Sequence, residues 1–246
     1  MKATLSILII LFAGLIGGAQ TNPVKNFETD TFETSKGSLK ITFIGHGTLM
    51  IGAGNQVIHI DPVSREADFS KLPKANLILL THDHFDHLDK KAISMISTLQ
   101  TKIILSKSCK ELIDNGIVLL NGEHTTFGDW GVEAVPAYNL IHKRPDGLPF
   151  HSGGNGNGYV ISYGGKRIYI AGDTENIPEM GNLKNIDIAF LPMNLPYTMT
   201  PQMVADGAKS FMPAILYPYH YGETNPQLLV DLLKDTPIKV IIPKMR

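Results

Sequence analysis

Residues 79–89 read LLTHDHFDHLD, and this stretch decides how the rest of the chain is interpreted. An apolar run ends at Leu80, and the six positions that follow Thr81 hold five ionisable residues: His82, Asp83, His84, Asp86 and His87. Imidazole and carboxylate groups are good zinc ligands, and a tight turn can direct alternate side chains into one volume. A solvated loop has no reason to select histidine over lysine, serine or glycine. The spacing therefore predicts a metal site. Four candidate ligands within six residues, with the ligand pairs of two sites interleaved, fit two neighbouring ions better than one.

The segments on either side of this cluster predict where it lies in the fold. Residues 75–81 (ANLILLT) form a continuous apolar run, which predicts a strand buried on both faces. After the cluster, apolar residues recur at helical spacing at Leu88, Ala92, Met95, Ile96 and Leu99. We therefore expect the cluster on the turn from a buried strand into a helix.

Strand patterns dominate the remaining sequence, with fewer helical segments. Two local predictions are specific: a helix near 107–115, and a hairpin whose turn is Asn121–Gly122. Two later strands end in residues suited to metal binding. Asp173 follows the apolar run RIYIAG, and His220 ends the run AILYPYH. Both residues are expected where a buried strand meets the rim of a sheet.

Composition limits the classes of function. The chain has 246 residues with 43% hydrophobic content, enough to bury the core of one full-sized domain. Its formal charge of -1 gives no electrostatic case for binding nucleic acid or an anionic membrane. Cys109 is the only cysteine, which excludes an intrachain disulfide and a thiolate zinc site. The sequence also lacks a phosphate-binding loop and a G-x-S-x-G serine nucleophile.

The first nineteen residues have the composition of a signal peptide. Lys2 supplies a positive start, Leu5–Ile16 an apolar core, and Gly17-x-Ala19 a small-residue cleavage pattern. The apolar run is shorter than the roughly 20 residues that a membrane-spanning helix needs. An uncleaved anchor is the alternative. We predict secretion, most simply to a bacterial periplasm, and no stable membrane anchor.

The mature chain is predicted to begin near Gln20. Residues 20–37 (QTNPVKNFETDTFETSKG) are polar and lack periodicity, so we interpret them as a tether. Residues 38–246 are predicted to form the functional domain.

Four motifs together resemble one known family. THDHFDHLD (81–89) is similar to the metal-binding signature of the metallo-β-lactamase-fold hydrolases, AGDT (171–174) to their strand-end Asp motif, and YPYHYG (217–222) to their final His motif. Residues 44–62, IGHGTLMI and VIHIDP among them, resemble the opening strands. The resemblance covers about 40–246 and is strongest to the lactonase-like branch, which also resembles N-acyl-phosphatidylethanolamine phospholipase D. It implies an α/β (α+β) fold, a four-layer αββα sandwich, with the metal site at one rim between two sheets.

The resemblance also implies a set of ligands. His82 and His84 would bind a first ion together with a third histidine. Asp86, His87 and His220 would bind a second ion, and Asp173 would bridge both. Asp86 and Asp173 are the expected catalytic residues.

The third histidine of the first site is where the chain departs from the family pattern. Many relatives place it at the end of the strand that corresponds to VEAVPAYN, where this chain has Asn139. His151 and His142 are the candidates. We prefer His151, because it precedes a hairpin strand after a glycine-rich loop that can fold back. His142 and Asn139 remain alternatives.

Other polar residues near these motifs have expected supporting roles. Asp61 ends its strand and could accept a hydrogen bond from a ligand imidazole, which would fix the tautomer of that ring, or it could simply be a turn residue. His46 is expected to support a ligand in the same way, His59 to be a core or supporting residue, and His124 to lie on the surface.

The implied function is a secreted, metal-dependent hydrolase of an ester, lactone or phosphodiester. Two divalent ions, zinc by default with Mn²⁺ or Fe acceptable, would lower the pKa of a bound water from about 15.7 towards 7 and so create the nucleophile. The alternative is a non-hydrolytic metal-binding or di-iron redox member of the same fold. The di-iron pattern resembles one with Glu at the position of His84, which disfavours it. The motifs around Asn139 and His220 likewise look unlike those of β-lactam-cleaving enzymes.

Overall fold

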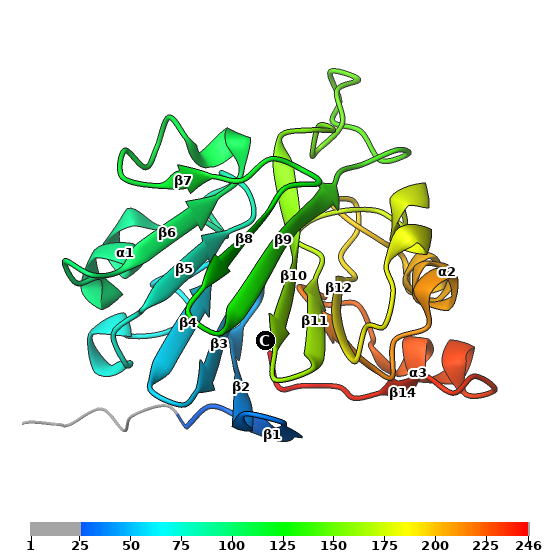
Figure 1. The fold of residues 1–246 in the computed structure, drawn as a ribbon. Coiled ribbons are helices and arrows are strands. Elements are labelled where there is room, and N and C mark those ends of the chain that lie inside the picture. The colour runs from blue at the N-terminus through cyan, green and yellow to red at the C-terminus, as the bar shows by residue number, and fades with distance from the viewer. Residues whose placement is uncertain (1–25, 246) are drawn as a thin grey trace, which may run out of the picture.

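The computed structural model describes residues 26–245, which form two seven-stranded sheets that face each other (Figure 1). The first sheet consists, in spatial order, of β1 (Thr29–Thr34), β2 (Gly37–Gly45), β3 (Thr48–Ala53), β4 (Gln56–Ile60), β5 (Leu77–Leu80), β6 (Lys102–Leu105) and β7 (Ile117–Val118). The second consists of β14 (Lys239–Val240), β13 (Ile215–Tyr219), β12 (Ile188–Pro192), β11 (Lys166–Ile170), β10 (Gly156–Tyr163), β9 (Trp130–Ala137) and β8 (His124–Phe127). Each half of the chain therefore builds one sheet.

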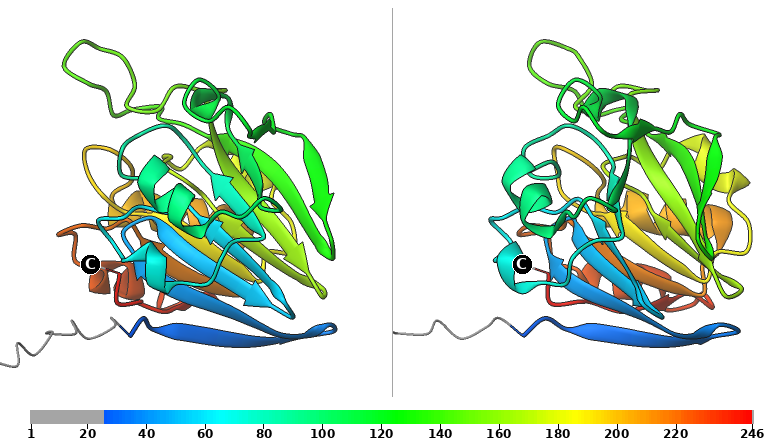
Figure 2. Two further views of the ribbon diagram at one scale, coloured as in Figure 1. Left: turned by 90° about the vertical axis from the view of Figure 1, so that its left-hand side faces the viewer. Right: turned by 60° about the vertical axis from the view of Figure 1, so that its left-hand side comes forward.

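Helices cover the outer face of each sheet (Figures 1 and 2). On the first sheet these are α1 (Lys90–Ile96) and the 3₁₀ turns η1 (Phe69–Lys71) and η2 (Lys107–Cys109). On the second they are η3 (Pro178–Asn182), α2 (Pro201–Phe211) and α3 (Gln227–Leu233). This arrangement confirms the predicted αββα sandwich. Within residues 26–245, no helix has the length and apolar character needed to cross a membrane.

The strand that precedes the histidine cluster is buried on both faces, as predicted. In β5, Leu77 and Leu79 join the core between the sheets, whereas Ile78 and Leu80 pack in the core beneath α1. Because successive side chains of a strand point to opposite faces, a fully apolar strand can serve both cores at once. This double burial fixes the end of β5, and so the start of the cluster, in place.

The parallel strands set the position of the functional rim. β4, β5, β6 and β7 run parallel to one another in the first sheet, and β11, β12, β13 and β14 do so in the second. Parallel neighbours end at the same edge, which is where open α/β sheets place ligands. β5 leads into His82, β11 into Asp173, and β13 into His220. The three predicted metal-binding segments therefore leave their sheets at strand ends.

Part of the predicted tether is a strand. Residues 29–34 form β1, which pairs antiparallel with β2 from Thr29 opposite Thr42 to Thr34 opposite Gly37. Burial alternates along β1 with no fully buried position, as is usual for an edge strand. Because the apolar signal of this segment is weak, the sequence predicted a polar tether instead of a strand. The predicted signal peptide (1–19) and residues 20–25 lie outside the described residues.

The predicted helix near 107–115 is wrong beyond its first turn. η2 covers only Lys107–Cys109, and the amides of Leu112 and Ile113 both bond to the carbonyl of Cys109 in a turn that does not continue. A short helix gains few hydrogen bonds against the cost of nucleation. The segment instead buries Cys109 and Ile113 in the core beneath α1.

The predicted hairpin at Asn121–Gly122 is also wrong. β7 belongs to the first sheet and β8 to the second, so residues 119–123 cross between the sheets. The Asn121 side chain donates hydrogen bonds to the carbonyl of Val135 (3.2 Å) and to Asn157 Oδ1 (2.8 Å). The asparagine that suggested a tight turn thus anchors the crossing to the second sheet.

The helix after the cluster is shorter than its apolar pattern predicted. α1 begins after Asp89, whose carboxylate accepts hydrogen bonds from the amides of Lys91 and Ala92, and it ends at Ile96. Leu99, the last residue of the pattern, lies beyond the helix and is exposed.

Candidate metal centre

The seven predicted ligands lie together at the rim between the two sheets. They come from four loops at strand ends, and their ligand atoms fall into overlapping groups within 4.8 Å of one another. The members of these groups are His46, His82, His84, Asp86, His87, His151, Asp173 and His220. All seven predicted residues are present, and His46 is an addition.

The first group contains His82, His84 and His151. Nε2 of His151 lies 3.2 Å from Nδ1 of His84, and the rings of His82 and His84 are 4.7 Å apart between centroids. The preferred third histidine, His151, therefore lies beside the first two. The alternative, His142, points elsewhere, because its Nδ1 lies 2.6 Å from a carboxylate oxygen of Glu175.

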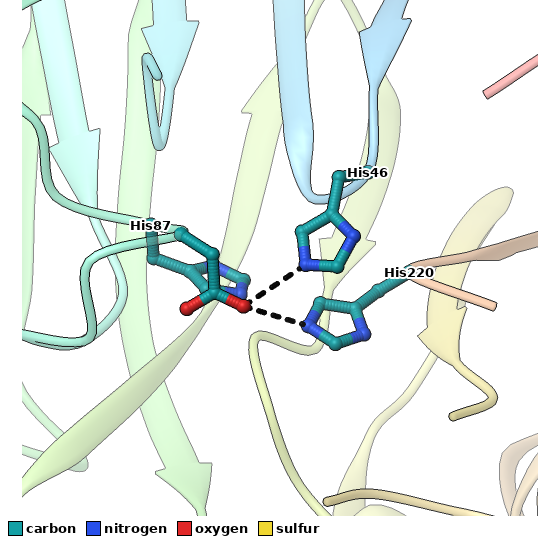
Figure 3. Close-up of side chains that lie close together, drawn as sticks. His46, His87 and His220 are labelled. Atoms are coloured by element: carbon teal, nitrogen blue, oxygen red, sulfur yellow. Dashed lines mark hydrogen bonds and ion pairs between the residues drawn. The ribbon is translucent and has the colours of Figure 1, made fainter. Parts of the chain in front are cut away.

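The second group contains His46, Asp86, His87 and His220 (Figure 3). Asp86 Oδ2 lies 3.1 Å from Nε2 of His46 and 3.8 Å from Nε2 of His220. The ring of His46 also packs against that of His220, with 3.7 Å between centroids. Sequence reasoning gave His46 a supporting role only. The structure places it near enough to bind an ion with Asp86.

Asp173 lies between the two groups, as expected of a bridging ligand. Its Oδ2 is 3.3 Å from Nε2 of His151 in the first group and 3.2 Å from Nε2 of His220 in the second. Its Oδ1 is 3.4 Å from Nε2 of His87. One carboxylate therefore contacts histidines of both groups.

The polar atoms of this centre are better placed to bind a cation than to hydrogen-bond to each other. Among residues 26–245, His82 Nε2, His87 Nε2, Asp173 Oδ1 and both ring nitrogens of His220 are buried and make no hydrogen bond. Buried polar atoms are nearly always hydrogen-bonded, and each one left unsatisfied costs about 1–3 kcal/mol. Imidazole nitrogens and a carboxylate oxygen are the donor set of a zinc-type ion. The residues present therefore fit divalent metal binding.

The protonation states of the histidines depend on how each is placed. Burial lowers the pKa of His82 well below its ordinary value, so this ring is neutral, which is the form that binds metals. Burial also lowers the pKa of His220, but the charges of Asp173 and Asp86 outweigh it and raise that pKa to about 10. An ion that binds here must displace this proton, so metal binding is coupled to proton release.

The two carboxylates stay ionised despite their surroundings. Burial alone would raise the pKa of Asp173, yet His220 and His87 hold it well below its ordinary value. The pKa of Asp86 is likewise lowered against burial, by the neighbouring imidazoles of His220 and His46. Both side chains therefore offer negative charge to a cation at neutral pH.

Asp61 makes the predicted hydrogen bond to a ligand imidazole. Its Oδ2 accepts from Nδ1 of His87 at 2.7 Å and from the Thr81 hydroxyl at 2.6 Å, and its Oδ1 accepts from the Thr81 amide at 2.8 Å. This contact places the His87 proton on Nδ1 and leaves Nε2 free to face Asp173. By contrast, His59 is a core residue that donates to the carbonyl of Pro73, and His124 is exposed.

Asn139 supports His151 rather than replacing it. The Asn139 Oδ1 atom accepts hydrogen bonds from the His151 ring Nδ1 (2.6 Å) and amide (2.9 Å), which directs Nε2 into the centre. The Asn139 amide donates to Glu175 Oε1 at 3.2 Å. Glu175 is fully buried and also accepts from the backbone amides of residues 140–142. Sequence reasoning missed Glu175, although it follows AGDT directly.

The backbone around the centre is held in unusual conformations. His46, Asp61 and His220 have φ angles of 49°, 44° and 48°, in the left-handed region that residues other than glycine rarely adopt. Such conformations cost about 1–3 kcal/mol each and concentrate at functional sites. Gly47 is required for a different reason. A Cβ there would lie 2.6 Å from Cε1 of His87.

Comparison with known proteins identifies the family. A family model described as a beta-lactamase superfamily domain matches residues 40–220. The chain belongs to the beta-lactamase superfamily. It is 31% identical to a UPF0173 metal-dependent hydrolase of Ligilactobacillus salivarius, with 81% of this chain and 93% of that protein covered.

Two solved structures agree with this assignment. A protein of Parabacteroides distasonis assigned as a metal-dependent hydrolase is 48% identical, has a TM-score of 0.86, and is matched over 90% of this chain and 100% of its own. Igni18, a metallo hydrolase of Ignicoccus hospitalis, shares the fold with a TM-score of 0.67 at 24% identity, over 83% of this chain and 94% of its own. The predicted family is confirmed, and this beta-lactamase superfamily protein is a metal-dependent hydrolase.

Gly47→Ala should weaken metal binding by this superfamily domain. The added methyl group would push the His87 ring out of the centre, and we expect at least about a 10-fold loss of zinc affinity. Titration against a competing zinc-binding dye measures the change. Gly181→Ala is the matched control, because open space surrounds that position. Equal affinities for the two variants would contradict the proposed importance of this contact.

Asn139→Ala should also lower zinc affinity, by about 10- to 100-fold, because the His151 ring loses the acceptor that orients it. Asn182→Ala, at an exposed position on η3, should leave the affinity unchanged. The same competition assay serves for both variants. Wild-type affinity in Asn139→Ala would show that packing alone holds His151.

Proposed function

We propose that this protein is a secreted hydrolase that uses two divalent metal ions, zinc by default, to cleave an ester, lactone or phosphodiester. The observation that carries the proposal is the position of Asp173. Its carboxylate contacts His151 in one group and His220 in the other, and buried nitrogens without hydrogen bonds face it from both sides. A single ion would leave part of this donor set unused.

The proposed ligands divide between the two ions. His82, His84 and His151 would hold the first ion, Asp86, His87 and His220 would hold the second, and Asp173 would contact both. When bound, such ions supply an activated water at neutral pH and polarise a carbonyl or phosphoryl oxygen. Asp173 and Asp86 are the proposed catalytic residues. Both stay ionised, so each can accept a hydrogen bond from the attacking water and orient it.

A cavity suited to a small-molecule substrate lies over the centre. It has a volume of about 540 Å³, and five of the proposed ligands form part of its lining: His84, Asp86, His151, Asp173 and His220. Sites for small molecules usually have volumes of about 300–1,000 Å³. A bound substrate would therefore lie directly against the metal ligands.

The remaining parts of the proposal come from the sequence. Residues 1–19 suggest a cleaved signal peptide and a periplasmic location. The imidazole-rich donor set favours zinc, although Mn²⁺ and Fe accept the same ligands. The alternative is a non-hydrolytic or di-iron redox member of the fold, for which stoichiometric iron and oxygen consumption would be the signature.

Hydrolysis should require both the metal and the predicted ligands. On a panel of p-nitrophenyl acetate, lactones and bis(p-nitrophenyl) phosphate, we expect activity with at least one class of substrate. Prolonged treatment with a chelator should abolish it, and zinc should restore it. His84→Ala should lower the activity by at least about 100-fold. Mutation of residues that only hydrogen-bond to metal ligands already lowers metal affinity or activity by about 10- to 100-fold. His124→Ala, at an exposed position on β8, is the control.

A folded, zinc-loaded protein that cleaves none of these substrates would contradict the proposal. Activity that survives both chelation and His84→Ala would contradict it as well, because hydrolysis would then not depend on the centre.

A further inference from the structure

Arg144 lies at the boundary of two cavities beside the metal centre. It lines both the cavity of about 540 Å³ and a smaller one of about 180 Å³, together with His84 and Phe150. Arg144 is exposed and belongs to the loop between β9 and β10. It is therefore the cationic residue placed to contact any molecule that reaches the first group of ligands from either cavity.

Arg144 has no carboxylate partner within residues 26–245. Its Nη2 lies 3.0 Å from the carbonyl oxygen of Phe150 and 3.2 Å from Nε2 of His84, and no acidic side chain of the described chain forms an ion pair with it. The other arginine of the larger cavity, Arg65, pairs with Glu66 at 3.0 Å. The charge of Arg144 is thus available to a ligand.

The contact between Arg144 and His84 cannot persist once an ion is bound. Nδ1 of His84 faces His151 within the first group and Nε2 faces Arg144, so Nδ1 would be the atom that binds an ion. An imidazole that gives its Nδ1 lone pair to a cation carries its proton on Nε2, and a guanidinium has only donors. Nε2–H of His84 and the guanidinium of Arg144 would then be two hydrogen-bond donors facing each other at 3.2 Å. Metal binding would therefore free Arg144 from His84, and the hydrogen bond to the Phe150 carbonyl would remain.

A guanidinium in this position is suited to an oxyanion. Guanidinium groups bind carboxylate and phosphate oxygens in pairs, with strong charge-assisted hydrogen bonds. Aromatic side chains stand next to it: Phe150 packs edge-to-face on Tyr197 with 5.1 Å between centroids, and Phe85 is 78% exposed. The lining of the larger cavity thus adds one arginine without a carboxylate partner and three aromatic side chains to the carboxylates and imidazoles of the centre.

We infer that Arg144 binds an oxyanion of the substrate, a phosphate or a carboxylate, and so selects anionic esters that carry an apolar or aromatic group. The inference rests on the hydrolase function proposed above and narrows its substrate class. Arg144 acts here as a specificity-determining residue, not as a metal ligand.

Binding of phenylphosphonate to the zinc-loaded full chain tests this inference without turnover. By calorimetric titration, Arg144→Gln should weaken binding by about 10- to 100-fold, the range expected for loss of charged hydrogen bonds. Arg144→Lys, which keeps the charge but not the planar fork, should fall between Arg144→Gln and the wild type. Lys143→Gln is the matched control, because it removes one positive charge from the same loop at a residue that does not line either cavity. Its affinity should stay within about twofold of the wild type.

Turnover of three esters then shows whether Arg144 binds a phosphate or a carboxylate of the substrate. Arg144→Gln should lower kcat/KM for bis(p-nitrophenyl) phosphate or for mono-p-nitrophenyl glutarate by about 10- to 100-fold, and the arm that responds identifies the oxyanion. The neutral p-nitrophenyl acetate should change by less than about twofold. The zinc content of each variant, measured by mass spectrometry, should equal that of the wild type.

Three results would overturn the inference. They are unchanged phenylphosphonate binding in Arg144→Gln, an equal loss of activity on the neutral ester, and a loss of zinc in both Arg144 variants. The last two would make Arg144 a structural residue. If the zinc-loaded protein cleaves no ester but still binds phenylphosphonate through Arg144, the proposed hydrolysis fails while the oxyanion site stands.

Discussion

The buried charge of Asp173 is the constraint on which the rest of the centre depends. This side chain is 4% exposed, and four histidine rings lie within 4 Å of its oxygens. A carboxylate removed from water is costly unless it is paired. The histidines compensate it only in part, because burial keeps His82 neutral while His220 holds a proton. Cations in this position would satisfy the carboxylate and the unpaired nitrogens together.

The fold supplies this geometry through the ends of its strands. The double burial of β5 fixes the start of the cluster, and β11 and β13 in the opposite sheet bring Asp173 and His220 to the same rim. Hydrogen bonds from residues around the centre then orient the imidazole rings. Asp61 orients His87, and Asn139, held by Glu175, orients His151. Left-handed residues and the missing side chain of Gly47 let the loops approach so closely.

Sequence reasoning succeeded where chemistry is dense and local. The cluster at 82–87 and the strand-end positions of Asp173 and His220 follow from residue type and periodicity. For Asp61, the sequence allowed a hydrogen bond to an imidazole and a plain turn equally well. The preference for His151 over His142 agrees with the geometry of the first group, but it needed the structure for support. The path of the long loop that carries both histidines could not be predicted from its sequence pattern. Its backbone at Ile141 and His142 bonds to the buried Glu175, which lies more than thirty residues further along the chain.

The errors have a common physical cause. β1, the crossing at 119–123 and the turn after Cys109 are all placed by contacts with distant segments rather than by local preference. An edge strand such as β1 shows little apolar alternation, and an Asn-Gly pair does not reveal whether its flanking strands share a sheet. His46 was underestimated for the same reason, since only the fold brings the β2–β3 turn against His220.

Anomalous diffraction at the zinc edge, from crystals of the zinc-loaded protein, tests the central claim most directly. We expect two zinc peaks on either side of Asp173, one among His82, His84 and His151 and the other among Asp86, His87 and His220. A single ion, ions bound elsewhere, or a zinc-free centre in well-ordered crystals would contradict it.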